Sequence, residues 1–138
     1  MASFWFIVGG SLFGILGLIH AVYTFSDLSH PRRLVPDDPA VIAAMSASGV
    51  RLARGGTTMW RAWVGFNLSH SLGAMMFSLV CIAAGLSFGA LAWSKAVLLV
   101  PVAIGLIYLW LAIRFWFRVP AIGIAAGTLC LAVGWLLY

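Results

Sequence analysis

The sequence predicts an all-α membrane protein, a four-helix transmembrane bundle with a short amphipathic helix in the loop between spans one and two. Three observations support this fold class. The 138 residues are 64% hydrophobic and only 8% charged, which is too little charge to cover a soluble domain. The apolar residues gather in four stretches, each about as long as the ~20 residues that cross a hydrocarbon core. Nearly all basic residues fall on one side of these stretches.

The four spans use most of the chain. Together with one sizeable loop, residues 25–58, they leave no room for a separate soluble domain, so residues 1–138 are expected to form a single integral membrane domain. In chain order, the predicted spans are residues 3–24, 59–85, 91–117 and 119–137.

The loop contains a predicted helix. Asp38 is a good N-cap, and Pro39 suits the first helical position. Residues 40–54 then form the helix, which the glycines at 55 and 56 end. With Arg51 and Arg54 near its end, this segment is typical of an amphipathic helix on the inner leaflet. An ordinary connecting helix packed on the bundle is the alternative.

Charge predicts the topology. Basic residues in short loops stay in the cytoplasm, so loop 25–58 is expected inside and both termini on the outer side. Only Lys95 lies on the opposite face. The excess of arginine favours contact with anionic lipid heads and does not indicate nucleic-acid binding. The seven residues on the cytoplasmic face are Arg32, Arg33, Arg51, Arg54, Arg61, Arg114 and Arg118.

The second span has a polar face and a face of small residues. Gly65, Ser69 and Gly73 follow one another at four-residue spacing, opposite the polar arc. Such a helix is expected to be buried on both faces and to form the centre of the bundle. The polar arc consists of Trp60, Trp63, Asn67, His70, Ser71, Ala74 and Ser78.

Small residues also recur at four-residue spacing in the first and last spans, as Gly10 with Gly14 and Gly123 with Gly127. In lipid this spacing lets helix backbones approach closely. It most often packs the chain's own bundle, and less often marks a seam for a homo-oligomer or a larger membrane complex. Membrane lipids are the other expected partners.

Polar side chains from all four spans gather in the predicted cytoplasmic half. Counted from the span ends, His20 lies about 7 Å deep and His70 about 15 Å deep. This convergence predicts a pocket that binds the head of an amphipathic molecule, with aromatic walls for its tail. The candidate ligand-binding residues are His20, Tyr23, Trp60, Trp63, Asn67, His70, Tyr108 and Arg114.

Each candidate also has a purely structural explanation. His70 and Asn67 could simply make interhelical hydrogen bonds. His20 and Tyr23 could form a pair at the membrane edge. Arg114 follows Trp110 by four residues, so it could make a cation–π contact with that ring or extend its side chain to the lipid heads.

Catalytic and cofactor sites find little support. Haem ligation by His20 and His70 conflicts with their different depths, and His70 with Cys130 gives zinc only two ligands. No acidic residue lies within a predicted span, which argues against carboxylate-driven transport. We therefore expect no cofactor, no metal and no catalytic residue, and we prefer a binding protein to an enzyme.

The chain resembles a family of small bacterial four-span membrane proteins along essentially its whole length. The resemblance rests on the sequence Met-Trp-Arg-Ala-Trp-Val-Gly-Phe-Asn-Leu-Ser-His-Ser at residues 59–71 and on an upstream His-x-x-Tyr. It implies a bacterial cytoplasmic membrane location but no activity. Its motif positions are His20, Tyr23, Trp60, Arg61, Trp63, Asn67 and His70.

These observations predict a small inner-membrane protein that binds a lipid- or quinone-like molecule in its cytoplasmic half. An accessory or assembly subunit of a larger membrane complex is the first alternative. A membrane enzyme acting on a lipid head group, with His70 as acid–base, is the second.

Overall fold

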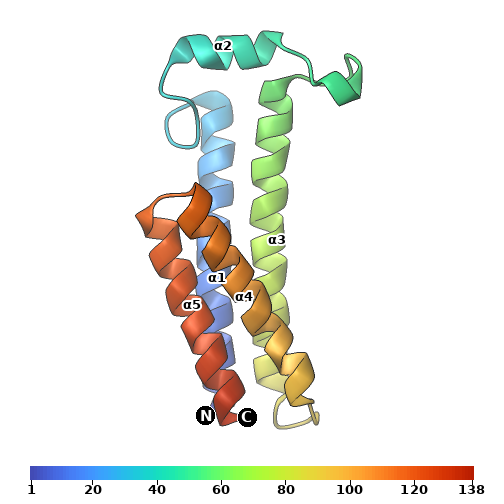
Figure 1. The fold of residues 1–138 in the computed structure, drawn as a ribbon, viewed down its shortest axis with the longest axis vertical. Coiled ribbons are helices and arrows are strands. Elements are labelled where there is room, and N and C mark those ends of the chain that lie inside the picture. Colours follow the sequence, from blue (N-terminus) through green and yellow to red (C-terminus); the bar gives the residue numbers. More distant parts are fainter. The chain divides into compact units, whose positions relative to one another are not determined.

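The computed structural model describes residues 1–138 and is helical almost throughout (Figure 1). The prediction of an all-α fold with four long helices and a short loop helix is confirmed. A single antiparallel bridge, between Gly49 and Thr58, is the only β-type pairing. The helices are α1 (Ala2–Ser29), α2 (Pro39–Ala47), a 3-10 turn (Arg51–Ala53), α3 (Met59–Ser87), α4 (Lys95–Phe115) and α5 (Arg118–Leu137).

The helices α1, α3, α4 and α5 are each long and apolar enough to cross a membrane, which makes this a multi-pass membrane protein. Two of their ends differ from the predicted ones by more than two residues. α4 begins late because Ser94 caps it, accepting a hydrogen bond from the Val97 N–H at 3.3 Å. α1 continues past its predicted end to Ser29, two residues before Pro31, so its last turns include Asp27.

The loop helix starts as predicted and ends early. The Asp38 carboxylate accepts from the Ala40 N–H at 2.8 Å, with proline at the first helical position. The predicted end at Arg54 is wrong, because Ser48 turns extended and its carbonyl accepts from the Met59 N–H at 2.9 Å. Because the Ser48 carbonyl is paired with the start of α3, the helix ends at Ala47.

The chain forms two compact units and passes between them within α1 and within α3. We call residues Met1–Gly17 and Gly73–Tyr138 the bundle unit, and residues Leu18–Leu72 the loop unit.

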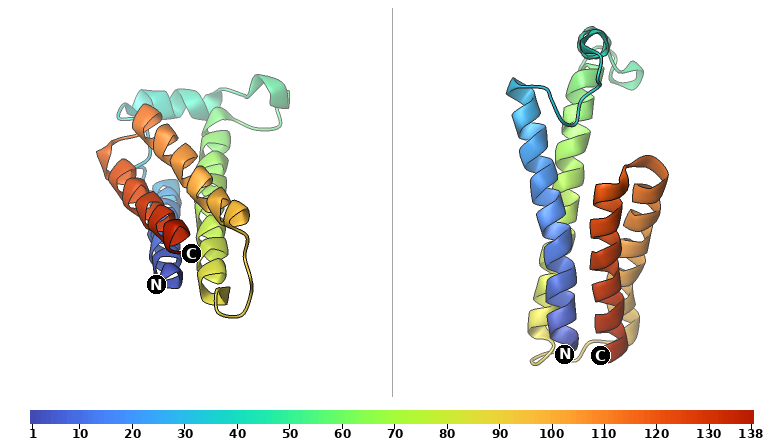
Figure 2. Two further views of the ribbon diagram at one scale, coloured as in Figure 1. Left: turned by 60° about the horizontal axis from the view of Figure 1, so that its bottom comes forward. Right: turned by 90° about the vertical axis from the view of Figure 1, so that its left-hand side faces the viewer.

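In the bundle unit, α4 and α5 lie antiparallel, side by side (Figure 2). The core of this unit is apolar, and its rings meet edge to face, as in the pair Phe13 and Phe77 at 4.9 Å between centroids. Its buried members are Phe6, Phe13, Cys81, Ala84, Leu98, Val102 and Leu131.

Glycines let the helices of the bundle unit approach closely. A Cβ on Gly9 would lie 2.9 Å from the Gly127 carbonyl oxygen, and one on Gly10 would lie 2.9 Å from Cys81 Cβ. Gly14 faces Ser78, and Gly123 faces Leu16. All four residues of the predicted stripes at Gly10, Gly14, Gly123 and Gly127 therefore pack against this chain's own helices.

Within the loop unit, α2 runs across the ends of α1 and α3 (Figures 1 and 2). Only one face of α3 is covered here: Asn67 and Ser71 are each 1% exposed, whereas Gly65 and Ser69 are exposed. The prediction that α3 is buried on both faces is therefore wrong for this chain alone. The small-residue face has no neighbouring element, and a Cβ at Gly65 would meet nothing within 4 Å.

Candidate functional site

Three polar side chains meet between α1 and α3 in the loop unit. His20 Nε2 lies 2.9 Å from Asn67 Oδ1, and the rings of His20 and His70 are in edge-to-face contact with centroids 5.4 Å apart. The amide nitrogen of Asn67 donates to the Trp63 carbonyl at 2.8 Å, which leaves Oδ1 as the acceptor for His20. His20 therefore donates through Nε2, and both the oxygen and the nitrogen of the Asn67 amide are hydrogen-bonded.

Neighbouring hydroxyl groups bond to their own helices. Ser71 Oγ donates to the Asn67 carbonyl, and Thr24 Oγ1 donates to the His20 carbonyl, each at 2.9 Å. These bonds to the residue four positions earlier satisfy hydroxyls that would otherwise be stranded in an apolar setting. No buried side-chain nitrogen or oxygen in the protein lacks a hydrogen-bond partner.

Asp27 is the residue that sequence reasoning missed. Its carboxylate is 4% exposed and accepts three backbone N–H groups, from Arg32 at 3.0 Å, Arg33 at 3.1 Å and Leu34 at 2.7 Å. We call this arrangement the Asp27 clamp. One signal could have found it: an acidic residue in the last turn of a helix opposes the helix dipole and needs compensating donors.

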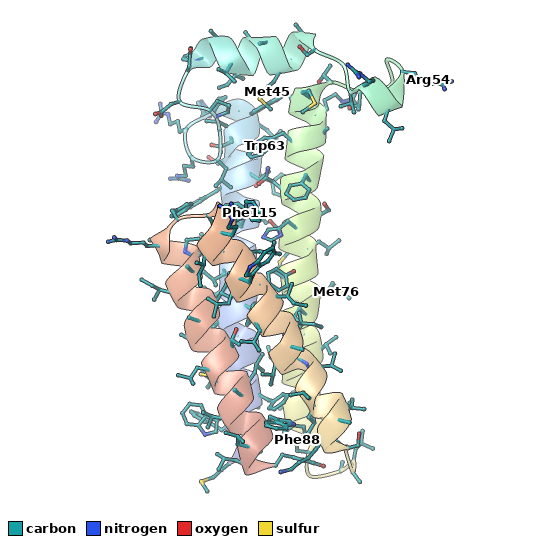
Figure 3. The ribbon with its side chains drawn as sticks, viewed as in Figure 1. Met45, Arg54, Trp63, Met76, Phe88 and Phe115 are labelled. Carbon is teal, nitrogen blue, oxygen red and sulfur yellow. The ribbon has the colours of Figure 1, made fainter.

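The Asp27 clamp and His20 belong to one hydrogen-bond network. Leu34, whose N–H binds Asp27, accepts at its carbonyl from Trp63 Nε1 at 2.9 Å. Trp63 in turn accepts from Asn67 at its own carbonyl. The path therefore runs from Asp27 through the loop backbone and Trp63 to Asn67 and His20. Figure 3 shows Trp63 on α3 in the middle of this region.

A small cavity lies beside this network. Its volume of about 10 Å³ is enough for about one water molecule. Three of its lining residues are polar, and the others are aromatic or aliphatic. The lining residues are Thr24, Asp27, Leu34, Val35, Trp60, Trp63, Val64 and Asn67.

Most of the candidate ligand-binding residues lie in the loop unit. His20 contacts both Asn67 and His70, and Trp60 and Trp63 line the cavity together with Asn67. Tyr23 makes a different contact: the Arg33 guanidinium stacks over its ring, with Cζ 4.4 Å from the ring centroid.

The other two candidates, Tyr108 and Arg114, belong to the bundle unit. Tyr108 packs against Phe13 and Phe77, with centroids 5.8 Å and 6.2 Å away. Arg114 makes its cation–π contact with Phe115, at 5.6 Å, and not with the predicted Trp110. Phe115 is the ring that meets Trp110, edge to face at 6.1 Å.

The predicted difference in depth between the two histidines is wrong. α1 extends to Ser29, so His20 lies nine residues, about 14 Å, from the end of its helix. His70 lies eleven residues, about 16 Å, from the start of α3 at Met59. The two rings therefore reach the same level and can touch.

The geometry of the histidine pair does not suit a haem. Bis-histidine ligation places the porphyrin between two imidazoles. Here the rings of His20 and His70 are in direct contact, and Asn67 already holds His20 Nε2. No group of three or more histidine, cysteine or acidic residues is arranged to hold a metal ion.

Comparison with known proteins adds no assignment: no family model, curated protein or solved structure matches this chain.

Proposed function

We propose that this protein binds the polar head of an amphipathic, lipid- or quinone-like molecule at its His20–Asn67–His70 cluster. The supporting observation is a fixed polar group inside an apolar helix pair. Asn67 is 1% exposed and bonded at both ends, and it orients a histidine that touches a second, half-buried histidine. Such groups cost free energy in a membrane, and intramembrane ionisable residues are functional candidates for that reason.

The apolar part of the ligand has a surface beside the histidines. Phe66 lies nearly parallel to the His70 ring, at 6.3 Å and 14°, and is 61% exposed. The nearby cavity holds only about one water molecule, so the tail does not enter it. In our proposal the tail runs along the lipid-facing side of α3, over Phe66, while the head reaches the histidines.

We place the protein in a bacterial cytoplasmic membrane, with both termini on the outer side. Four crossings return the chain to the face on which it began. The connection between α1 and α3 contains four arginines, and the positive-inside rule assigns it to the cytoplasm. The bacterial source rests on the resemblance of the motif around residues 59–71.

Ligand-dependent stability tests the proposal. The purified protein is heated with a short-chain ubiquinone or with a short-chain phosphatidylglycerol. A ligand present at about a hundred times its Kd adds about 2.7 kcal/mol of stability. We expect His70→Leu to remain folded and to lose that stabilisation.

The matched control is Ser69→Ala. Ser69 is the exposed neighbour of His70, and its hydroxyl bonds only to the carbonyl of Phe66. This variant should keep the full stabilisation. Equal stabilisation of His70→Leu and the parent protein by both probes would show that the cluster only joins helices.

A second candidate function is that of an accessory subunit in a larger membrane complex. One observation favours it: α3 leaves Gly65 and Ser69 exposed, on a face where a partner helix could approach closely. Ligand-independent association through this face, abolished by Gly65→Leu, would support the subunit over the binding protein.

A further inference from the structure

We propose that α2 and the arginines that flank it dock the loop unit onto an anionic leaflet of the membrane that α1 and α3 cross. The occupant of the exposed α2 surface is then the headgroup layer of anionic phospholipid. This proposal does not depend on the histidine cluster or on its ligand.

The exposed part of α2 is apolar and is not covered by the chain. The helix Pro39–Ala47 contains no charged residue and no buried one, and Val41 is 44% exposed. Figure 3 shows Met45 on the side of α2 that faces the helix ends, where it is half-buried. A helix of this composition is poorly suited to water and well suited to the boundary between headgroups and acyl chains.

The direction of α2 places it in the membrane plane. It runs across the ends of α1 and α3 within the loop unit (Figures 1 and 2). Since α1 and α3 are membrane-crossing helices, a helix perpendicular to both lies parallel to the bilayer surface. Its short connections keep it within reach of that surface.

Both connections to α2 are tied down. On one side, the Asp27 clamp holds the backbone of residues 32–34. On the other side, Val50 N–H donates to the Thr57 carbonyl at 3.2 Å, and Ser48 accepts from Met59 at 2.9 Å. The position of α2 is therefore built into the fold of the loop unit.

The charges around α2 favour anionic lipid. Residues 30–58 contain four arginines, all exposed or on exposed turns, against two aspartates. These two are Asp37, which is exposed, and Asp38, which caps α2. The buried Asp27, just before this segment, uses its carboxylate to accept from three backbone N–H groups. The flanking arginines are Arg32, Arg33, Arg51 and Arg54.

A protein partner fits this surface less well than a bilayer does. Stable interfaces bury about 800 Å² on each partner, which is more than a helix of 9 residues provides on one side. Juxtamembrane arginines each contribute about 1 kcal/mol of attraction to an anionic surface, or about fivefold in partitioning. Because α2 is tethered to membrane-crossing helices, the burial of its apolar surface and this attraction are enough for insertion.

The test places a fluorescent label on α2 of the full chain in lipid vesicles. The native Cys81 and Cys130 are replaced by alanine, and Val41→Cys carries an environment-sensitive dye. Vesicles are made of phosphatidylcholine alone or of equal parts phosphatidylcholine and phosphatidylglycerol. A headgroup-attached quencher and a water-soluble quencher are compared. We expect headgroup quenching in the anionic vesicles.

Charge variants make the test specific. The double variant Arg51→Gln, Arg54→Gln should lower lipid association of the label by about fivefold for each arginine in anionic vesicles. The matched pair Arg51→Lys, Arg54→Lys keeps the charge and should behave like the parent. His70→Leu should leave the quenching unchanged, which separates this proposal from that of ligand binding.

Two results would overturn the proposal. In one, the water-soluble quencher reaches the label equally in both vesicle types, and the α2 surface is then in water. In the other, both quenchers fail and the shielding depends on the protein-to-lipid ratio, and the surface is then covered by a second copy of the chain.

Discussion

The buried side chains of the bundle unit are apolar with two exceptions, Ser78 and Thr128, whereas four of the five in the loop unit are polar. In the bundle unit, close helix approach at glycines and interlocking aromatic rings fill the interior. In the loop unit the interior is a set of mutually satisfied hydrogen bonds. The buried polar residues there are Thr24, Asp27, Asn67 and Ser71.

Because their interiors differ in this way, the two units should respond to different kinds of mutation. Truncating a buried apolar side chain lowers the free energy of unfolding, and the loss grows with the volume of the cavity that is left. Removing one member of a buried hydrogen-bond network also lowers the free energy of unfolding, because its partner stays buried without a hydrogen bond. Variants that alter only volume or only polarity therefore test whether the two interiors are stabilised differently.

The largest effect is expected for Leu131→Ala in the bundle unit. The Leu131 side chain is fully buried and fills the space beside Gly9, so its truncation leaves a cavity. We expect a loss of about 3 kcal/mol in the free energy of unfolding, measured by denaturant titration in mixed micelles. Leu129→Ala, on the same helix but 65% exposed, should change that free energy little.

A smaller effect is expected for Asp27→Asn in the loop unit. The change preserves shape but removes the charge and one acceptor oxygen, so the three N–H groups of the Asp27 clamp cannot all be satisfied. We expect a loss of about 2 kcal/mol, together with faster hydrogen exchange at the Leu34 amide. Asp37→Asn, at an exposed position, is the control. Unchanged exchange at Leu34 would contradict the role given to the clamp.

The smallest effect is expected for Asn67→Leu. The substitution keeps the branching and the number of heavy atoms of the side chain and removes the hydrogen bonds to His20 and Trp63. Interhelical hydrogen bonds in lipid contribute about 1 kcal/mol, so a loss of that size is expected in the same titration. If Asn67→Leu instead cost as much as Leu131→Ala, the distinction between the two interiors would fail.

Several features of the candidate site could be predicted from the sequence. Asn67, His70 and Ser71 lie at helical spacing on one face of α3, and the sequence places His20 in the same half of the membrane, although at a smaller depth. Helical periodicity is enough to place such residues on a common side. The contact between His20 and His70 could not be predicted, because it depends on how far α1 extends beyond Thr24.

The class of this protein and the start of its loop helix follow from the sequence alone, because hydropathy, span length and the N-cap at Asp38 act locally along the chain. Three other features arise from the tertiary structure. It brought Asp27 into contact with the backbone of residues 32–34, covered one face of α3 while leaving Gly65 exposed, and ended α2 at Ala47 by pairing Ser48 with Met59. The first and third depend on which backbone groups meet across the loop, and the second depends on which helices pack against α3. Residue type alone specifies neither.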